Sequence, residues 1–380
     1  MKVLMMPDWR EGNTYQSLLA QALEKQGVHV HFPHGYRRGF PLIRAILDLP
    51  EPPAVLHLHW PEPYLPGRNA VTYALFGLRL LADIAMVQAR GVRVVWTVHN
   101  RGAHEGRFPS LESWVLKQLA ARVDGVIVHS RSAARELTAT WNLPAEKAVV
   151  IPHGHYRGVY GDPPPASEAR HKLQLPLEGR VYLHFGKLRR YKGTEELLEA
   201  WPAHHAQHPA DVLLIVGEPL DEAYSRELEA KASTGVRMIA RRIPDADIPV
   251  YFAAADVAVL PFRNILTSGS LLLAMSFGKP VIAPRLEVLE EVAEPATGLF
   301  FHPTRETLAG SLARSAQADL VSIARRTAEA CSRYGWERVA EITRSLYTQP
   351  PQAIAQPHGS RALLTILASV SWLLSSLRAA

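Results

Sequence analysis

The chain has 380 residues, 47% of them hydrophobic and 21% charged, which is typical of a soluble globular protein and long enough for two domains. The single cysteine, Cys331, excludes an internal disulfide framework and a cysteine-rich metal site, and it favours a reducing compartment. The formal charge of +6 lies wholly in residues 1–160, which hold 18 Lys and Arg against 12 Asp and Glu, so this half can face anionic lipid or a phosphorylated substrate. Since the chain has no zinc finger, aromatic RNA-binding signature or Lys/Arg run, no nucleic-acid partner is expected.

The first residues predict the start of a doubly wound α/β domain. Lys2–Pro7 is too short an apolar run for a signal peptide and predicts a strand, followed by an amphipathic helix, Ser17–Gln26, and a second strand, Val28–Phe32. The turn Gly12-Asn13 follows the carboxyl end of the first strand, where such sheets bind ligands. We therefore expect Gly12 and Asn13 in a ligand-binding loop.

Two histidines share one face of the next predicted strand, Ala54–Trp60. His57 and His59 are two residues apart, which would suit a pair of metal ligands. The same spacing recurs in His29/His31 and His153/His155, on separate strands or loops, and no adjacent carboxylate completes any of these pairs. Scattered pairs do not make one ligand set, so no metal site is predicted.

A long apolar segment, Ala70–Ala89, predicts a helix. Arg79 and Asp83 interrupt it, which makes it a poor transmembrane segment and favours a core helix. The alternative is a membrane-facing patch, which the basic balance of this half supports.

Titratable groups follow the predicted buried strand Val92–Val98. His99 lies at its carboxyl end, and the loop beyond carries His104 and Glu105. A histidine there could orient a substrate hydroxyl and a glutamate could take its proton, so His99, His104 and Glu105 are candidate catalytic residues. The alternative is that these loop residues only cap the next helix.

The pattern loosens between Tyr156 and Pro176, where three consecutive prolines occur, and we place a domain border there. A strand, Arg180–Phe185, then leads into Gly186-Lys187 and Lys192-Gly193.

A second segment of interest, Phe262–Pro284, combines a strand end, the turn Thr267–Ser270, an apolar helix and another strand. Backbone N–H groups at such a helix start bind anions, although a capped core helix would give the same pattern. With Lys187 and Lys192 in the same domain, the combination predicts a diphosphate site that needs no metal. Asp245-Ala246-Asp247 has the form of an Asp-x-Asp metal motif, but it directly precedes a short helix, so helix N-capping is the preferred explanation.

Several motifs together resemble those of the GT-B glycosyltransferases of the group 1, family 4-like type. They are Gly186-Lys187, Lys192-Gly193, Val216-Gly217, Asp256-Val257, Leu260-Pro261 and the run AMSFGKPVIA at 274–283. His153-Gly154 resembles the family's Pro-Asn-Gly step, and Gly335-Trp336-Glu337 resembles the start of its C-terminal helix. The resemblance covers residues 1–348 and is more specific in the second half.

The resemblance implies an α/β protein with two Rossmann-like doubly wound domains that face each other across a cleft. Residues 1–160 would bind the acceptor, residues 161–335 would bind a nucleotide sugar, residues 336–348 would form a helix crossing back to the first domain, and residues 349–380 would form a linker and an apolar tail helix.

The resemblance also assigns roles to residues of this chain. The diphosphate would be held by Gly186, Lys187, Lys192 and the turn Ser268, Gly269, Ser270 and Leu271, and the base would lie by Arg242 and Ile243. His99 would lie near the donor sugar, and Gly12, Asn13 and His153 would line an acceptor or donor-sugar loop.

One departure from the family concerns a pair of glutamates eight positions apart around the phosphate turn. Ile265 and Leu273 occupy those positions here. The chain is therefore expected to be a divergent branch, either an active enzyme with a general base such as Glu105 or a protein that only binds a nucleotide sugar.

The preferred hypothesis is a metal-independent hexosyltransferase that needs no cofactor beyond its UDP- or GDP-linked donor. Its acceptor would be lipid-linked or a polysaccharide, in exopolysaccharide or cell-surface glycan assembly at the inner face of the cytoplasmic membrane. The basic first half and the uncharged segment 362–377 favour a peripheral membrane location. The other hypotheses are an inactive nucleotide-sugar-binding component of a polysaccharide assembly complex, and a GT-B-fold epimerase or phosphorylase.

Overall fold

The computed structural model describes residues 1–102, 108–293, 297–303 and 307–349. The chain forms two compact units, each assembled from separate segments. Unit 1 comprises residues 1–127, 137–149 and the chain from 340 onward, and unit 2 comprises residues 128–136 and 150–339. His104, Glu105 and the predicted tail helix lie outside the described residues.

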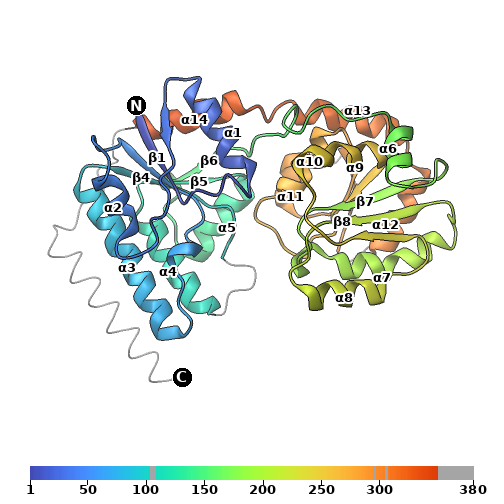
Figure 1. Ribbon diagram of the computed structural model, residues 1–380, viewed down its shortest axis with the longest axis horizontal. Helices are drawn as coiled ribbons and strands as arrows, with labels where there is room; N and C mark the ends of the chain where they lie inside the picture. Colours follow the sequence, from blue (N-terminus) through green and yellow to red (C-terminus); the bar gives the residue numbers. More distant parts are fainter. Residues whose placement is uncertain (103–107, 294–296, 304–306, 350–380) are drawn as a thin grey trace. The chain divides into compact units, whose positions relative to one another are not determined.

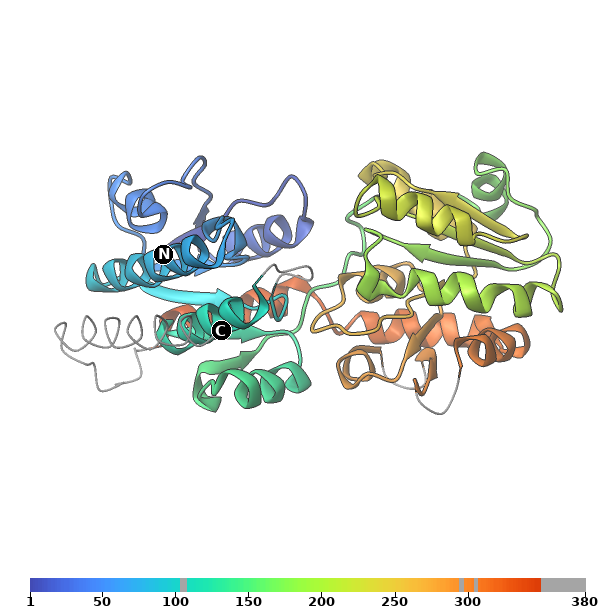
Figure 2. The ribbon, with the colours of Figure 1, turned by 90° about the horizontal axis from the view of Figure 1, so that it is seen from below.

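Unit 1 is built on a six-stranded sheet in the order β2-β1-β3-β4-β5-β6, with parallel pairing from β2 to β5. The strands are β1 (Lys2–Met6), β2 (His29–His31), β3 (Val55–Leu58), β4 (Arg93–Thr97), β5 (Gly125–Val128) and β6 (Ala148–Val150). The helices are α1 (Thr14–Glu24), α2 (Pro41–Leu47), α3 (Ala70–Ala89), α4 (Pro109–Arg122) and the parts of α5 (Arg131–Trp141) and α14 (Trp336–Thr348) from residues 137 and 340 onward, with short 3-10 helices η1 (Glu62–Tyr64) and η2 (Ala145–Lys147). Helices cover both faces of the sheet (Figures 1 and 2).

Unit 2 repeats this architecture with the order β12-β11-β10-β7-β8-β9, all parallel. Its strands are β7 (Val181–Phe185), β8 (Val212–Val216), β9 (Val236–Ile239), β10 (Val257–Val259), β11 (Val281–Pro284) and β12 (Gly298–Phe301). Its helices are α6 (Ala166–Lys172), α7 (Thr194–His205), α8 (Glu222–Lys231), α9 (Ile248–Ala254), α10 (Gly269–Ser276), α11 (Glu287–Ala293), α12 (Leu308–Gln317) and α13 (Leu320–Cys331), with η3 (Arg190–Lys192) and η4 (Asp245–Asp247). One face carries α7, α8 and α12, and the other carries α6, α9, α10 and α13 (Figure 1).

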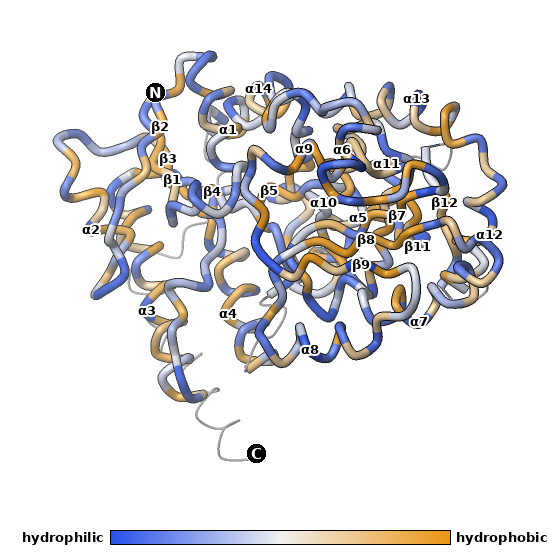
Figure 3. Tube along the Cα trace, turned by 45° about the vertical axis from the view of Figure 1, so that its right-hand side comes forward, coloured by the Kyte–Doolittle hydropathy of each residue, from blue (hydrophilic) through white to orange (hydrophobic). Residues whose placement is uncertain are grey.

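The central strands are mostly apolar because both faces of each sheet are covered by helices. In unit 2, β8 is hydrophobic throughout and β7 mostly so (Figure 3), and they pack against Trp201 of α7 and Tyr224 of α8, both fully buried. The predicted fold, two Rossmann-like doubly wound domains, is therefore confirmed.

Three features differ from the sequence prediction. The stretch where we placed the domain border contains α6, which packs on α9, and unit 2 begins before residue 160. α2 was not predicted. Its first N–H groups, those of Leu42 and Ile43, donate to the Asp83 carboxylate at 2.8 and 2.9 Å, because a helix start needs acceptors and a buried carboxylate needs donors.

The same contact explains the charge inside α3. This helix is long and apolar enough to cross a membrane by length and composition alone. It packs against α2 and α4, and Leu80, Leu81 and Ile84 are fully buried there. α3 is therefore a core helix of unit 1 with one exposed side.

Candidate active site

The sheet of unit 2 has its switch point between β7 and β10. β8 and β9 lie on one side of β7, and β10 to β12 lie on the other, so the loops leaving β7 and β10 turn to opposite faces. Ligands of open α/β sheets bind in the crevice at such a point. The loop after β7 holds residues 186–193, and the loop after β10 leads into the first turn of α10. The two predicted anion-binding segments therefore meet at one place.

Lys192 is the buried cation of this place. Its side chain is 7% exposed, and its Nζ donates to Ser270 Oγ at 3.3 Å. Gly186 has φ +117, and a Cβ there would lie 2.9 Å from Nζ, so glycine is needed at this strand end. Burial, together with the positive charges of Arg189 and Lys187, lowers the pKa of Lys192 to about 8. An anion bound here would stabilise the charged form of the Lys192 ammonium and offset the cost of its burial.

Gly193 fixes the position of Lys192. It has φ +73 and precedes the first residue of α7, and a Cβ would collide with the carbonyl oxygen of Pro261 beyond β10. The backbones of the two loops therefore touch at Gly193.

The first turn of α10 contributes fewer donors than the sequence indicated. Ser268 is the N-cap, and its Oγ accepts from the N–H of Leu271 at 3.0 Å. The N–H of Leu271 is therefore used within the turn, so the prediction that Leu271 binds phosphate needs correction, whereas the Ser268 hydroxyl keeps its own proton to donate. The N–H groups of Gly269 and Ser270 are the first-turn donors that the helix cannot satisfy itself, and the Ser270 hydroxyl lies beside them.

A buried histidine and tyrosine border the same turn. The Tyr156 hydroxyl lies 3.4 Å from His153 Nε2, and a Cβ on Gly269 would lie 3.1 Å from that hydroxyl. His153 Nδ1 lies 2.7 Å from the carbonyl oxygen of Gly154, which fixes the proton on Nδ1. Burial, with the neighbouring His129, lowers the pKa of His153 to about 3, so the ring is neutral and its Nε2 accepts.

The other predicted residues of unit 2 differ from Lys192 in burial or in place. Lys187 is exposed. Arg242 and Ile243 follow β9 at the edge of the sheet, with Ile243 buried and Arg242 exposed. Ile265 is buried, so an apolar side chain occupies the first of the two positions where the family carries glutamate.

The aspartates Asp245 and Asp247 do not act as predicted. Asp247 occupies the N-cap position of α9 but its side chain makes no cap bond; it lies 3.4 Å from the ammonium of Lys172. Within the described parts of the chain, no group of three or more His, Cys, Asp or Glu side chains could hold a metal ion. Metal independence stays a prediction.

In unit 1 the switch point lies between β1 and β3. Asn13 follows β1 and caps α1 by accepting from the N–H of Tyr15 at 2.9 Å, and Gly12 is exposed. The ends of β3 and β4 bring His59 and His99 together, with 3.1 Å between His59 Nδ1 and His99 Nε2.

His99 is part of a buried aromatic cluster. Its ring stacks on Trp60 with centroids 4.1 Å apart, and Tyr15 meets it edge-on at 4.8 Å. His57 lies two residues before His59, and its Nε2 is 2.7 Å from Thr97 Oγ1. The predicted placement of His99 at a strand end is confirmed.

His57 also binds the last helix of unit 1. Its Nδ1 lies 2.6 Å from the hydroxyl of Tyr347 in α14, and both side chains are buried. The two histidines thus have different partners. His57, in β3, joins α14 to the sheet, and His59, just after β3, positions His99.

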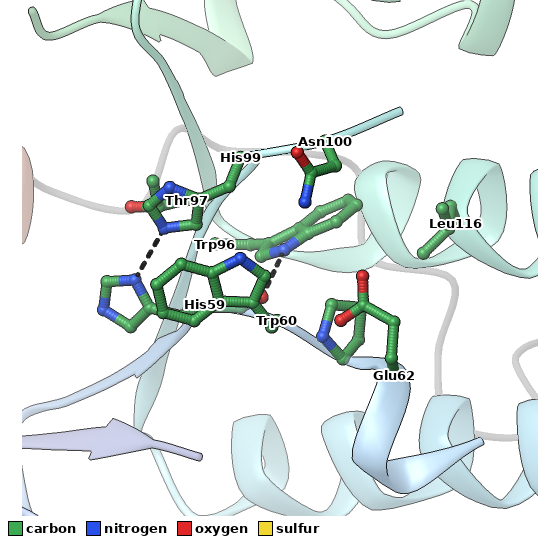
Figure 4. A pocket seen from close by; sticks show the side chains of 9 residues that line it. His59, Trp60, Glu62, Trp96, Thr97, His99, Asn100 and Leu116 are labelled. Atoms are coloured by element: carbon green, nitrogen blue, oxygen red, sulfur yellow. Dashed lines mark hydrogen bonds between the residues drawn. The ribbon is translucent and has the colours of Figure 1, made fainter. Parts of the chain in front are cut away.

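A small open pocket adjoins this cluster (Figure 4). Its lining includes Trp60, Glu62, Trp96, His99 and Asn100. The carboxylate of Glu62, at the start of η1, points toward the indole of Trp96 (Figure 4). Its Oε2 is buried and has no hydrogen-bond partner among the described residues. The indole of Trp60 and the carboxylate of Glu62 at one opening are groups that recognise sugars, whose apolar ring faces stack on indoles and whose hydroxyls need acceptors.

Sequence reasoning overlooked Glu62, Trp60 and Tyr156. Glu62 lies in a proline-containing turn, WPEPY, directly after the strand that ends in Trp60. Its place after a parallel strand was the available signal, the same one that singled out His99.

Comparisons with known proteins agree with this geometry. The sequence model of the group 1 glycosyl transferases matches residues 179–317, and that of glycosyltransferase family 4 matches residues 12–155. The chain is 32% identical over 301 residues to a GDP-mannose:glycolipid 4-beta-D-mannosyltransferase of Xanthomonas campestris pv. campestris, covering 78% of this chain and 79% of that protein. The chain belongs to the group 1 glycosyltransferases. This glycosyltransferase is also 25% identical over 308 residues to a D-inositol 3-phosphate glycosyltransferase of Thermobispora bispora, with 75% of this chain and 72% of that protein covered.

Solved structures show the same GT-B fold for this glycosyltransferase. Anabaena HepE in complex with UDP-glucose superposes with a TM-score of 0.69 at 18% identity, covering 92% of this chain and all of that one. Sucrose-phosphate synthase from Thermosynechococcus elongatus gives 0.68 at 21% identity, covering 91% and 98%. The predicted family and enzyme class are confirmed: the protein is a hexosyltransferase that uses a nucleotide-sugar donor.

Proposed function

We propose that this enzyme transfers a hexose, with mannose from GDP-mannose as the first candidate, to the sugar of a lipid-linked acceptor, in cell-surface polysaccharide assembly. The observation that carries the donor part is the site of Lys192, Gly186, Gly269 and Ser270 in unit 2. It combines a buried ammonium with helix-start N–H groups, which neutralise a leaving diphosphate. The similarity to a glycolipid mannosyltransferase supports the choice of GDP-mannose and of a glycolipid.

The diphosphate site itself needs no metal in this proposal. The charge that a divalent ion would supply elsewhere comes from Lys192, with Lys187 and Arg189 nearby as further positive charges. No cofactor other than the donor is proposed. EDTA should therefore leave turnover unchanged.

A peripheral location at the cytoplasmic membrane surface is part of the same proposal. The neighbouring helices α2 and α3 expose large apolar side chains, among them Leu47 at 50%, Val71 at 60% and Leu75 at 59%. Exposed arginines surround them in sequence, namely Arg37, Arg38, Arg44 and Arg68. Apolar side chains with basic neighbours suit an anionic lipid surface.

The test of the activity is GDP release from GDP-mannose in the presence of octyl β-D-glucopyranoside, a one-sugar glycolipid with a free 4-hydroxyl. Acceptor-dependent release and a mannosylated product are expected, with UDP-glucose as the competing donor. Saturable GDP binding without product from either donor would refute the enzymatic proposal and favour a nucleotide-sugar-binding component. Release from donor alone would favour an epimerase or hydrolase.

The test of the membrane part is cosedimentation with phosphatidylglycerol and phosphatidylcholine vesicles. Binding to the anionic vesicles, reduced in Val71→Asp with Leu75→Asp, is expected. Equal binding by this double variant would refute the role of α3.

A further inference from the structure

The unit 1 pocket contains a carboxylate that the family resemblance did not single out. Glu62 has a buried Oε2 without a hydrogen-bond partner among the described residues, and its carboxylate is directed into a pocket at the ends of β3 and β4 (Figure 4). A buried carboxylate oxygen without a hydrogen-bond donor destabilises the folded protein, which points to a ligand that donates to it. The hydroxyl groups of a sugar are such donors.

We propose that Glu62 is the general base of the transfer reaction and that the pocket lined by Trp60, Trp96 and His99 holds the acceptor sugar. This inference rests on the proposed function. GDP-mannose is an α-glycosyl diphosphate, so a β-linked product requires inversion at C1. Inversion by direct attack needs a base within hydrogen-bond reach of the acceptor hydroxyl.

The step balances without a further reactant. The acceptor hydroxyl gives its proton to the Glu62 carboxylate while its oxygen forms a bond to C1 of the hexose. The bond between C1 and the diphosphate oxygen breaks, and GDP leaves with that electron pair. The carboxylic acid then returns its proton to water.

His99 is less suited to this task. Its Nε2 is engaged by His59 at 3.1 Å, and its ring is held between Trp60 and Tyr15. A histidine fixed in this way can line the pocket and orient a hydroxyl, whereas Glu62 has an uncommitted oxygen.

The surroundings of Glu62 suit a base at neutral pH. Its neighbours with titratable groups are Glu112 of α4, Tyr73 of α3 and the pocket histidines His59 and His99. Burial, with the negative charge of Glu112, raises the pKa of Glu62 to about 7. A base is most effective when its pKa lies near the working pH.

The first experiment measures kcat/KM between pH 5 and 9 for Glu62→Gln, with GDP-mannose and octyl β-D-glucopyranoside. In the unsubstituted enzyme the rate should fall about tenfold per pH unit below pH 7, because protonated Glu62 cannot accept a proton. Glu62→Gln should lose about 10²–10⁴-fold in rate and show no acid limb. Glu112→Gln should move the limb to lower pH, because it removes the charge that raises the pKa of Glu62.

The second experiment separates a base from a structural residue. Azide needs no deprotonation, so sodium azide at about 0.5–1 M should restore GDP release in Glu62→Ala and give mannosyl azide. GDP affinity and thermal stability, which report on unit 2 and on folding, should match those of the unsubstituted enzyme.

Three results would overturn the inference. The first is a Glu62→Gln enzyme that keeps its rate and its acid limb. The second is a Glu62→Ala enzyme that azide does not rescue. The third is a Glu105→Gln enzyme that shows the rate loss and the missing acid limb expected of Glu62→Gln. If the unsubstituted enzyme shows no turnover at all, the proposed function fails instead, so the two failures are distinguishable.

Discussion

Replacing the buried ammonium of unit 2 gives the sharpest test of the donor site. Lys192→Met keeps an unbranched side chain of similar length and removes the charge together with the hydrogen bond from Nζ to Ser270 Oγ. The bound diphosphate then loses an interaction whose strength lies between that of a charge-assisted hydrogen bond and that of a partly desolvated ion pair. We expect a loss of about 2–4 kcal/mol in binding free energy. This corresponds to a roughly 30- to 1,000-fold weaker Kd for GDP.

The stability of the free protein should change in the other direction. The pKa of Lys192 falls from 10.5 to about 8 on folding, so the unfolded chain binds the proton more tightly and the charged lysine destabilises the folded state below pH 8. Removing the charge relieves at most about 3 kcal/mol at pH 7. The Tm of Lys192→Met without ligand should therefore stay level or rise while GDP binding is lost.

Isothermal titration with GDP and a thermal melt are the two measurements. Lys187→Met is the matched control, because Lys187 lies in the same loop but is exposed, and exposed charges are screened. It should weaken GDP binding less than about fivefold. The reasoning is refuted if Lys187→Met weakens binding as much as Lys192→Met, or if Lys192→Met lowers the Tm and leaves the Kd unchanged.

Three further predictions concern pH, backbone and the last helix. Binding of GDP should take up a proton near pH 8, and the affinity should fall as the pH rises above 8, because free Lys192 then loses its proton. Titrations in buffers of different ionisation enthalpy would measure this proton uptake. An affinity that does not change with pH would contradict the prediction. Gly193→Ala should destabilise unit 2 by more than about 2 kcal/mol in urea unfolding, because φ is +73 and a carbonyl oxygen occupies the place of the Cβ. The control, Gly158→Ala, has φ +72 and open space around its Cβ, and it should cost about 1 kcal/mol. Tyr347→Phe should cost about 1–2 kcal/mol because buried His57 loses a hydrogen bond, and unchanged unfolding would show that this bond adds nothing.

The sheets were predictable because their strands are short apolar runs bounded by glycine or polar turns. Gly186 and Lys192 could be placed at one strand end from sequence alone, because a strand followed by a glycine and basic residues has few other uses in a doubly wound domain. The contact of Lys192 with Ser270 could not be read, since it depends on the strand order that puts β10 beside β7.

The unit 1 pocket was not predictable for a related reason. Glu62 and Glu112 are fifty positions apart in the chain and interact electrostatically only because η1 and α4 both pack against α3. The sequence also predicted too many phosphate donors in the turn, because it does not reveal that the N–H of Leu271 already donates to the Ser268 hydroxyl. Composition around a turn indicates which donors exist but not which are already used.

The chain segments of unit 1 have a consequence for how the protein is made. This unit holds residues 1–127 and is completed by α14, whose Leu346 and Tyr347 are buried in it. A ribosome delivers those residues only after all of unit 2, so the first unit emerges early but lacks part of its core until synthesis is nearly over. A truncated chain ending before α14 would leave that gap open, and a design that isolates unit 1 should fuse residues 340–349 to it through a short linker.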